Sequence, residues 1–178
     1  MKLIKTKLKD CLIIEPKVFS DDRGFFLETF QDKRYSQLAG IDLPFVQDNH
    51  SRSTRGVLRG LHFQKTKPQG KLVRVVQGEV YDVALDLRKN SRSFGQWEGV
   101  ILSERNKRQF WVPPGFAHGF LVLSDKVDFE YKCTDYYDPL DEGSVLWNDP
   151  SLAIPWPIDD PILSKKDATA DTLDNLNL

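Results

Sequence analysis

Residues between Gly56 and Val80 could carry out acid–base chemistry if the fold brought them into one cavity. His62 is one of only three histidines, and because its ordinary pKa lies at about 6.5 it is a natural proton acceptor at neutral pH. Lys71 follows after a polar segment and could stabilise negative charge that develops on an oxygen atom. A hydrogen-bonded core histidine and a solvent-exposed lysine at a strand end are the alternatives that the sequence leaves open.

Arg59 and His62 lie on one predicted strand, where regular alternation would point them to opposite faces. Gly60 stands between them, and a glycine inside a strand pattern commonly marks a bulge or a close approach of two backbones. We therefore expect a departure from regular geometry at Gly60 that brings both side chains into one cavity. Arg59, Arg23 and Arg74 could pair with phosphate through their planar guanidinium groups. Surface salt bridges are the alternative for each of them.

Two residues far along the chain could complete such a site. Tyr131 belongs to an alternating segment whose odd-numbered positions share one face, and a phenol there could donate a proton from the side opposite to the histidine. A buried structural tyrosine is the alternative. Asp167 could hold His62 in the required tautomer, but Ser164 stands three residues before it, which also fits a helix capping box.

The segment from Trp111 to Gly119 contains the pattern Pro-x-Gly-x-x-His, which ends at His118. The pattern resembles the second short motif of the cupin superfamily of β-barrels, whose metal-binding members also use a His-x-His pair and a glutamate in their first motif. Here the residues after His62 are phenylalanine and glutamine, so the metal set is incomplete and we expect no metal. His118 remains a candidate for a hydrogen bond to a ligand, and His50 is expected at the surface.

Composition limits the classes of protein to which the chain could belong. It has 178 residues, of which 40% are hydrophobic and 29% charged, with a formal net charge of -1. These values fit one globular domain over residues 1–178 and predict no binding to nucleic acid or membranes. The early apolar run Cys11–Ile14 is too short for a signal or membrane segment. With Cys11 and Cys133 as the only cysteines, we expect free thiols in a cytoplasmic protein.

Short extended segments recur along the chain, with Gly, Pro, Asn and Ser between them. This spacing predicts an antiparallel β-sandwich or barrel instead of a βαβ fold. We expect short helices at Asp32–Ala39 and from Ser164 through Asp171, and a polar loop at Gln47–Ser51. The main predicted strands are Val57–Phe63, Lys71–Gln77, Val80–Leu87, Gly99–Leu102, Gln109–Val112, Gly119–Leu123 and Val127–Cys133, with shorter ones before them, including Phe25–Phe30.

The motifs that surround these candidates extend over almost the whole chain. They are Arg23-Gly-Phe-Phe-Leu-Glu28, Gln47-Asp-Asn49, Leu58-Arg-Gly-Leu-His62-Phe, Gln69-Gly-Lys71, Pro-Gly-Phe-Ala-His118-Gly, Tyr131, Glu142-Gly-Ser-Val-Leu-Trp147-Asn-Asp and Leu163-Ser-Lys-Lys166-Asp167. Together they resemble the dTDP-4-dehydrorhamnose 3,5-epimerase family, and the resemblance runs from Leu3 to Asp174.

The resemblance implies a cupin-like antiparallel β-barrel (jelly roll) with a few short helices, one near the C-terminus, in a homodimer that uses no cofactor. It implies an isomerase that inverts C3 and C5 of dTDP-4-dehydro-6-deoxy-D-glucose on the route to dTDP-L-rhamnose. Within that reaction His62 is the implied proton acceptor, with Asp167 as its carboxylate partner. Tyr131 is the implied proton donor and Lys71 the support for the enolate. The implied substrate contacts are Arg23, Glu28, Gln47, Asn49, Arg59, His118, Glu142 and Lys166.

Three alternatives remain open on the sequence. A related epimerase would act at only one of the two carbons, because the same base and enolate support serve either outcome. A non-catalytic module for binding sugar nucleotides would use the same barrel. A metal-dependent cupin would need ligands that this sequence does not supply in the usual pattern.

Overall fold

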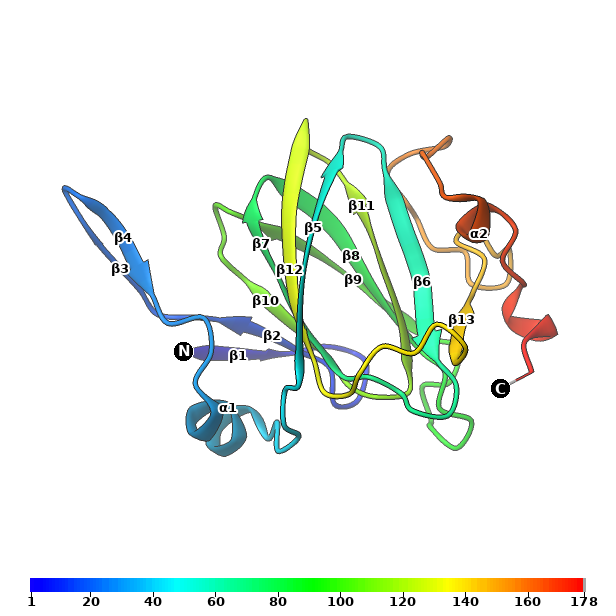
Figure 1. The fold of residues 1–178 in the computed structure, drawn as a ribbon, viewed down its shortest axis with the longest axis horizontal. Helices are drawn as coiled ribbons and strands as arrows, with labels where there is room; N and C mark the ends of the chain where they lie inside the picture. The colour runs from blue at the N-terminus through cyan, green and yellow to red at the C-terminus, as the bar shows by residue number, and fades with distance from the viewer. Residues whose placement is uncertain (178) are drawn as a thin grey trace.

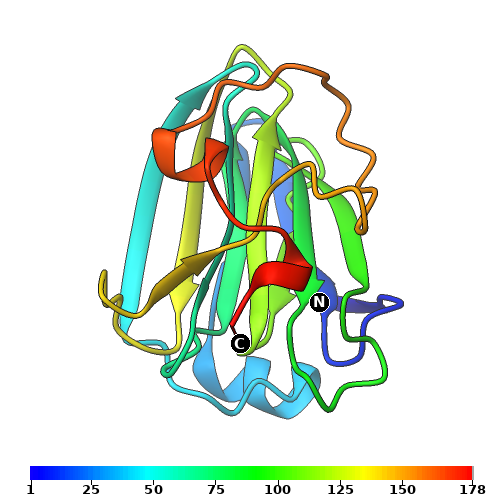
Figure 2. The same ribbon diagram turned by 90° about the vertical axis from the view of Figure 1, so that its right-hand side faces the viewer.

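Two antiparallel sheets face each other and enclose the interior of a β-barrel (Figure 1 and Figure 2). A separate hairpin extends from one side (Figure 1). The computed structural model describes residues 1–177. The first sheet has the strand order β1-β2-β10-β7-β12-β5, the second β13-β6-β11-β8-β9, and the hairpin is β3-β4. This arrangement confirms the predicted cupin-like jelly roll with a few short helices.

The strands and helices have the following bounds. They are β1 (Lys2–Lys5), β2 (Leu12–Glu15), β3 (Val18–Asp21), β4 (Gly24–Leu27), α1 (Asp32–Ala39), β5 (Gln47–Thr54), β6 (Leu58–Gln64), β7 (Lys71–Gln77), β8 (Glu79–Asp86), β9 (Trp97–Ser103), β10 (Gln109–Val112), β11 (Phe116–Val122), β12 (Lys126–Cys133), β13 (Glu142–Ser144), α2 (Lys165–Ala168) and the 3-10 turn η1 (Leu173–Asn175). The main predicted strands are all present, with ends shifted by at most three residues.

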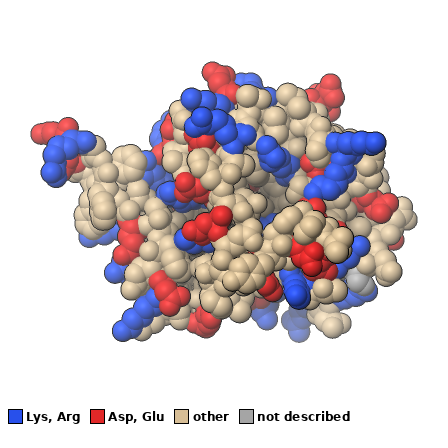
Figure 3. Space-filling view, in the orientation of Figure 1, with Lys and Arg blue, Asp and Glu red and all other residues tan. Residues whose placement is uncertain are grey.

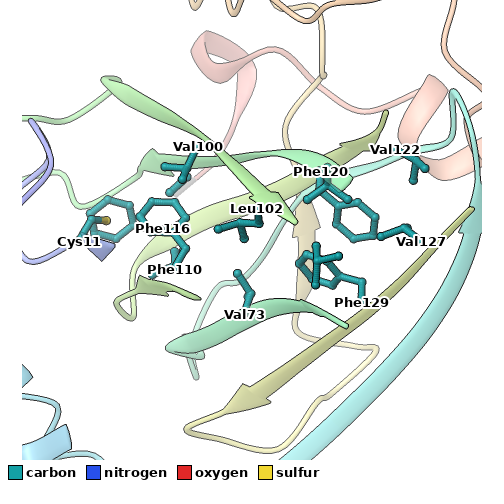
Figure 4. Close-up of a cluster of buried hydrophobic side chains, with 14 of the residues drawn as sticks. Cys11, Val73, Val100, Leu102, Phe110, Phe116, Phe120, Val122, Val127 and Phe129 are labelled. Atoms are coloured by element: carbon teal, nitrogen blue, oxygen red, sulfur yellow. The ribbon is translucent and has the colours of Figure 1, made fainter. Parts of the chain in front are cut away.

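Apolar side chains from both sheets fill the barrel interior. Phe120 of β11 stacks on Phe129 of β12 with ring centroids 4.2 Å apart, and these strands belong to different sheets. Figure 4 shows the two rings beside Val127, in a cluster that also contains Val73 of β7. Each such side chain stabilises the fold by about 1.5–3 kcal/mol when fully buried, so this core holds the two sheets together.

Strand β6 contains the bulge that the sequence predicts at Gly60. On the partner strand β11, His118 lies opposite His62. Phe120, two positions after His118 on β11, lies opposite Arg59. Arg59 and His62 are three positions apart on β6, so β6 has one extra residue between the two pairs. Gly60 has a φ of 132°, and a Cβ atom there would lie 2.5 Å from the glycine Cα of β11. Directly opposed residues share a face, so the bulge turns both side chains of β6 inward, as expected.

The polar loop predicted at Gln47–Ser51 is wrong, because this segment begins strand β5. Strand β5 pairs with β12 along its length and forms one edge of the first sheet. Its charged residues find partners on β12: Asp48 accepts from Lys132, and Arg52 donates to Asp128. An edge strand that faces water does not need alternating apolar residues, so the usual strand signal was missing.

Both predicted helices are present, but the second is shorter than expected. Helix α1 covers Asp32–Ala39, as predicted. Helix α2 begins after Ser164 and covers only Lys165–Ala168, so the predicted extension through Asp171 is wrong. Asp171 instead pairs with Val145 in an isolated β-bridge, and this tertiary pairing ends the helix. No helix within residues 1–177 has the length and apolar character needed to cross a membrane.

Cys11 and Cys133 are both buried free thiols, as predicted. Burial raises the pKa of each thiol above its ordinary value. Both therefore stay protonated at neutral pH and pack as small apolar groups.

Replacing Gly60 by alanine should destabilise the fold more than the same change at Gly40. Both residues have a positive φ, 132° and 66°, but a Cβ atom at Gly40 meets nothing within 4 Å. We expect Gly40→Ala to lower the free energy of unfolding by about 1 kcal/mol. We expect Gly60→Ala to lower it by about 3 kcal/mol or more, because overpacking adds to the backbone cost. Urea denaturation measures both changes, and equal losses would contradict the role of the close backbone approach.

Candidate active site

His62 of β6 and Asp167 of α2 form a hydrogen-bonded pair although 105 positions separate them in the sequence. Nε2 of His62 lies 2.5 Å from Oδ1 of Asp167. Asp167 is only 3% exposed, whereas the side chain of His62 keeps 26% of its surface exposed. A carboxylate on one ring nitrogen fixes the ring and leaves the other nitrogen available to accept a proton from a ligand.

Asp167 has both of the roles that the sequence left open, in the cap that Ser164 forms on α2 and in the pairing with His62. Oγ of Ser164 accepts a hydrogen bond from the backbone N of Asp167 at 3.1 Å, which caps α2, and donates one to Oδ2 at 2.8 Å. The cap and the pairing with His62 coexist because the two carboxylate oxygens serve different partners. Burial acts to raise the pKa of Asp167, but the hydrogen bonds with His62 and Ser164 outweigh it and hold the pKa below its ordinary value.

Lys71 and Tyr131 lie on the other sheet, on β7 and β12. Tyr131 packs against the buried core that includes Phe129, so alternation along β12 places its ring inside the barrel. Lys71 lies opposite Cys133, which shares this inward face. Nζ of Lys71 lies 6.0 Å from the ring centroid of Tyr131. The amine and the phenol therefore enter the same interior, across from His62.

Burial changes the acidity of both of these groups. It raises the pKa of Tyr131 to about 12, so the phenol keeps its proton at neutral pH. It lowers the pKa of Lys71, against the opposing influence of Cys133 and Asp82. A charge in such a half-buried position interacts more strongly with a ligand than it would in bulk water.

His118, which was predicted to contact a ligand, is buried against Asp82 of β8. Its Nε2 lies 2.9 Å and 3.0 Å from the two carboxylate oxygens, so a contact with a ligand would use Nδ1. The sequence reading did not identify Asp82. Val80 and Ala84, two positions before and after Asp82 on β8, belong to the core. A carboxylate between two core residues on the same face of a strand was the signal that could have revealed Asp82.

A hydrogen-bonded chain of polar residues connects four of the predicted substrate contacts through Tyr137. Glu142 lies 2.7 Å from Nζ of Lys166 and accepts from the hydroxyl of Tyr137 at 3.0 Å. The backbone N of Tyr137 donates to Gln47, and the side-chain amide of Gln47 donates to Asn49. The sequence reading did not select Tyr137, because nothing in its surroundings distinguishes it from an exposed loop tyrosine.

Arg59 is also on the inward side of β6, where its Nε donates to Oγ of Ser53 at 3.0 Å. It lies close enough to Tyr131 for its charge to lower the pKa of the phenol, although burial has the larger and opposite effect. The predicted contact Arg59 is therefore part of the same group as the phenol.

Arg23 and Glu28 are the predicted contacts that the structure does not bring to this group within one chain. Arg23 lies at the turn of the β3–β4 hairpin, where its side chain is 90% exposed and lies 2.6 Å from Asp21. Glu28 follows the hairpin and pairs with Arg34 of α1 at 2.6 Å. Figure 1 shows the hairpin projecting on the side of the barrel away from β6 and α2.

The surface is hollowed near the middle of the barrel, and lysine and arginine side chains lie beside the hollow (Figure 3). Within residues 1–177, no group of three or more His, Cys, Asp or Glu side chains is arranged to hold a metal ion. The interior thus presents a carboxylate-paired imidazole on one sheet, and a protonated phenol and an amine on the other. This arrangement can remove a proton from one side of a ligand and return one from the opposite side.

Comparison with protein families gives a match over nearly the whole chain. The family model described as dTDP-4-dehydrorhamnose 3,5-epimerase matches residues 5–175. The dTDP-4-dehydrorhamnose 3,5-epimerase of Salmonella typhimurium is 57% identical over 176 residues, which cover 98% of this chain and 96% of that protein. The enzyme of the same name from Escherichia coli is 54% identical over 178 residues, covering 99% and 96%.

Solved structures resemble this one closely. A dTDP-6-deoxy-D-glucose-3,5-epimerase from Legionella pneumophila, in complex with dTDP-4-keto-L-rhamnose, has a TM-score of 0.96 and 58% identity, covering 99% of this chain and 94% of that one. ChmJ from Streptomyces bikiniensis, a 3'-monoepimerase in complex with dTDP-quinovose, has a TM-score of 0.89 and 36% identity, covering 95% and 86%.

Asp167→Asn should destabilise the protein in a pH-dependent way. Because the folded-state pKa of Asp167 is lowered, its carboxylate stabilises the fold fully above the unfolded pKa of about 3.9, and this stabilisation is lost as the pH falls through the folded pKa. We expect the variant to lose about 1–3 kcal/mol of unfolding free energy at neutral pH, and the difference from the native protein to shrink in acid.

Urea denaturation at neutral pH and at a series of acidic pH values measures this difference. Asp22→Asn is the matched control, because Asp22 is exposed, and its effect should stay small throughout. A constant difference for Asp167→Asn down to strongly acidic pH would contradict stabilisation by the ionised carboxylate.

Proposed function

The chain belongs to the dTDP-4-dehydrorhamnose 3,5-epimerase family, and we propose that it inverts C3 and C5 of dTDP-4-dehydro-6-deoxy-D-glucose to give dTDP-4-dehydro-L-rhamnose. It would act as an isomerase of dTDP-L-rhamnose biosynthesis, as one domain over residues 1–178 in the cytoplasm. The observation that carries the proposal is the placement of a carboxylate-paired histidine and a protonated phenol on facing sheets.

His62 is the proposed base. The C4 ketone of the substrate acidifies the protons on both neighbouring carbons, so a base beside either carbon can remove one and leave an enolate. Asp167 accepts a hydrogen bond at Nε2 of His62, which orients the ring and stabilises the imidazolium that forms. The partly exposed ring of His62 lets the substrate approach.

Lys71 is the proposed partner of the enolate oxygen. Its amine enters the interior from β7, beside Tyr131. A fixed donor at a developing oxyanion contributes about 3–4 kcal/mol of transition-state stabilisation. Arg59, on the inward side of β6, is free to contact the anionic part of the substrate in addition to its hydrogen bond with Ser53.

Tyr131 is the proposed acid. Inversion requires the new proton to arrive on the face opposite to the one from which the first proton left. Tyr131 is on β12 and His62 is on β6, in different sheets, and burial keeps the phenol protonated until the enolate needs a proton. His118, Gln47, Asn49, Glu142 and Lys166 are proposed contacts to the sugar and nucleotide.

A single-carbon epimerase is the second candidate. The 3'-monoepimerase ChmJ has the same fold at 36% identity, so the fold alone does not separate one inversion from two. The 58% identity to a 3,5-epimerase favours the double inversion.

Deuterium incorporation distinguishes these candidates. The enzyme is incubated with dTDP-4-dehydro-6-deoxyglucose in heavy water, and NMR follows the label at C3 and C5. We expect label and inversion at both carbons. Label at one carbon would support the single-carbon epimerase, and no label would contradict catalysis altogether.

One variant at the proposed base and one at the proposed acid test the two roles in the same assay. His62→Ala should slow exchange at both carbons by about a thousandfold, while circular dichroism and dTDP binding stay unchanged. Tyr131→Phe should keep proton exchange but fail to complete inversion. Equal loss of exchange and inversion in Tyr131→Phe would count against a dedicated donor.

We also propose that the protein is a homodimer joined through the β3–β4 hairpin. An isolated two-stranded hairpin is at best marginally stable in water, yet this one exposes Phe19 by 52%, Phe25 by 58% and Phe26 by 68%. Burying these rings against a second copy would stabilise both. The same contact would carry Arg23 to the site of the partner subunit, where it could bind the substrate.

Analytical ultracentrifugation tests the dimer with two variants. Phe25→Ser/Phe26→Ser should shift the mass from twice the chain mass of 20.5 kDa toward a single chain. Arg23→Ala should remain dimeric but raise KM by about tenfold, since it removes one cation from the substrate site. A native protein that sediments as a monomer, or an unchanged KM in Arg23→Ala, would contradict this assembly.

A further inference from the structure

A basic cavity lies outside the candidate active site, between the N-terminal turn after β1 and the connection from β8 to β9. It has a volume of about 730 Å³, which is in the range of small-ligand sites. None of its lining residues belongs to the candidate active site. Four of them are cationic and none is a carboxylate. The lining residues are Lys7, Lys9, Arg88, Asn90, Ser91, Arg92, Ser93 and Gln96.

Arg88 forms a fixed wall of this cavity. Its Nε and Nη2 both donate to the carboxylate of Asp86 at 2.9 Å, and its Nη1 donates to Asp10 at 3.0 Å. Asp86 is fully buried and also accepts from the hydroxyls of Ser91 and Ser93. The buried carboxylate of Asp86 therefore has hydrogen-bond partners for both of its oxygens. These bonds fix the segment between β8 and β9 that lines the cavity.

Lys9 and Arg92 differ from Arg88, because neither side chain forms an ion pair with a carboxylate within residues 1–177. Both are exposed. Lys7 lies beside them with its Nζ 4.4 Å from the centre of the Trp97 ring, so its charge also has no carboxylate counter-ion at that end. Unpaired cations around a concave surface raise the local concentration of anions.

We propose that this cavity is a second binding site for a small anion of the diphosphate class. Arginine and lysine are the side chains that bind phosphate oxygens best, and the amides of Asn90 and Gln96 add neutral donors. Among residues 1–177, no aromatic side chain lines the cavity, so it offers no stacking surface for a nucleobase. The lining residues therefore suit the phosphate groups of a ligand but not a nucleobase, unlike a site that binds a whole sugar nucleotide.

Calorimetric titration with inorganic pyrophosphate at low salt tests the proposal. The full-length protein is first saturated with dTDP, which fills the sugar-nucleotide site. We expect one pyrophosphate to bind per chain under these conditions. Lys9→Ala/Arg92→Ala should weaken this binding by about tenfold, while turnover without pyrophosphate stays at the native level.

Lys33→Ala/Lys126→Ala is the matched control, because it removes two exposed positive charges outside the cavity. It should leave the pyrophosphate affinity within about twofold of the native value, since distant surface charges are screened. Equal weakening in both double variants would overturn the proposal in favour of general charge attraction. Loss of all pyrophosphate binding once dTDP is bound would also overturn it, since the anion would then occupy only the sugar-nucleotide site.

Discussion

The hydrogen bond between His62 and Asp167 is the contact on which the rest of the site depends. It requires the chain after β13 to return across the second sheet, a path visible in Figure 2. Backbone hydrogen bonds secure that path: Leu58 donates to Ile162, and an isolated bridge joins Val145 to Asp171. The C-terminal segment is therefore a structural part of the site and not a peripheral cover.

Burial acts against the charged forms of Tyr131, Asp167 and Lys71, and the neighbouring groups decide in which direction each pKa moves. Within residues 1–177, Tyr131 forms no hydrogen bond that would compensate for burial, so its pKa rises. Asp167 is buried as well, yet His62 and Ser164 reverse the effect and keep it ionised. Burial lowers the pKa of Lys71, although nearby acidic groups act to raise it. The same interior thus holds a neutral phenol and an ionised carboxylate at neutral pH.

Local signals in the sequence revealed much of the fold and part of the site. Gly60 indicated the bulge because only a glycine fits where two backbones meet so closely. The strand at Gln47–Ser51 was missed because an edge strand in water carries no alternating apolar pattern. The pairing of Asp167 with His62 could not be derived from spacing across 105 positions, and it came only from family resemblance. Asp82 was overlooked because its partner lies on another strand.

The double use of Asp167 makes the histidine of the site depend on the C-terminal segment. The last strand, β13, ends at Ser144, so the strands supply His62, Lys71 and Tyr131, whereas Asp167 comes from the C-terminal segment that follows them. The histidine acquires its carboxylate only when Ser164 has capped α2 and the segment has docked. A chain without this segment would keep His62 on β6 but would lack the carboxylate that pairs with its ring.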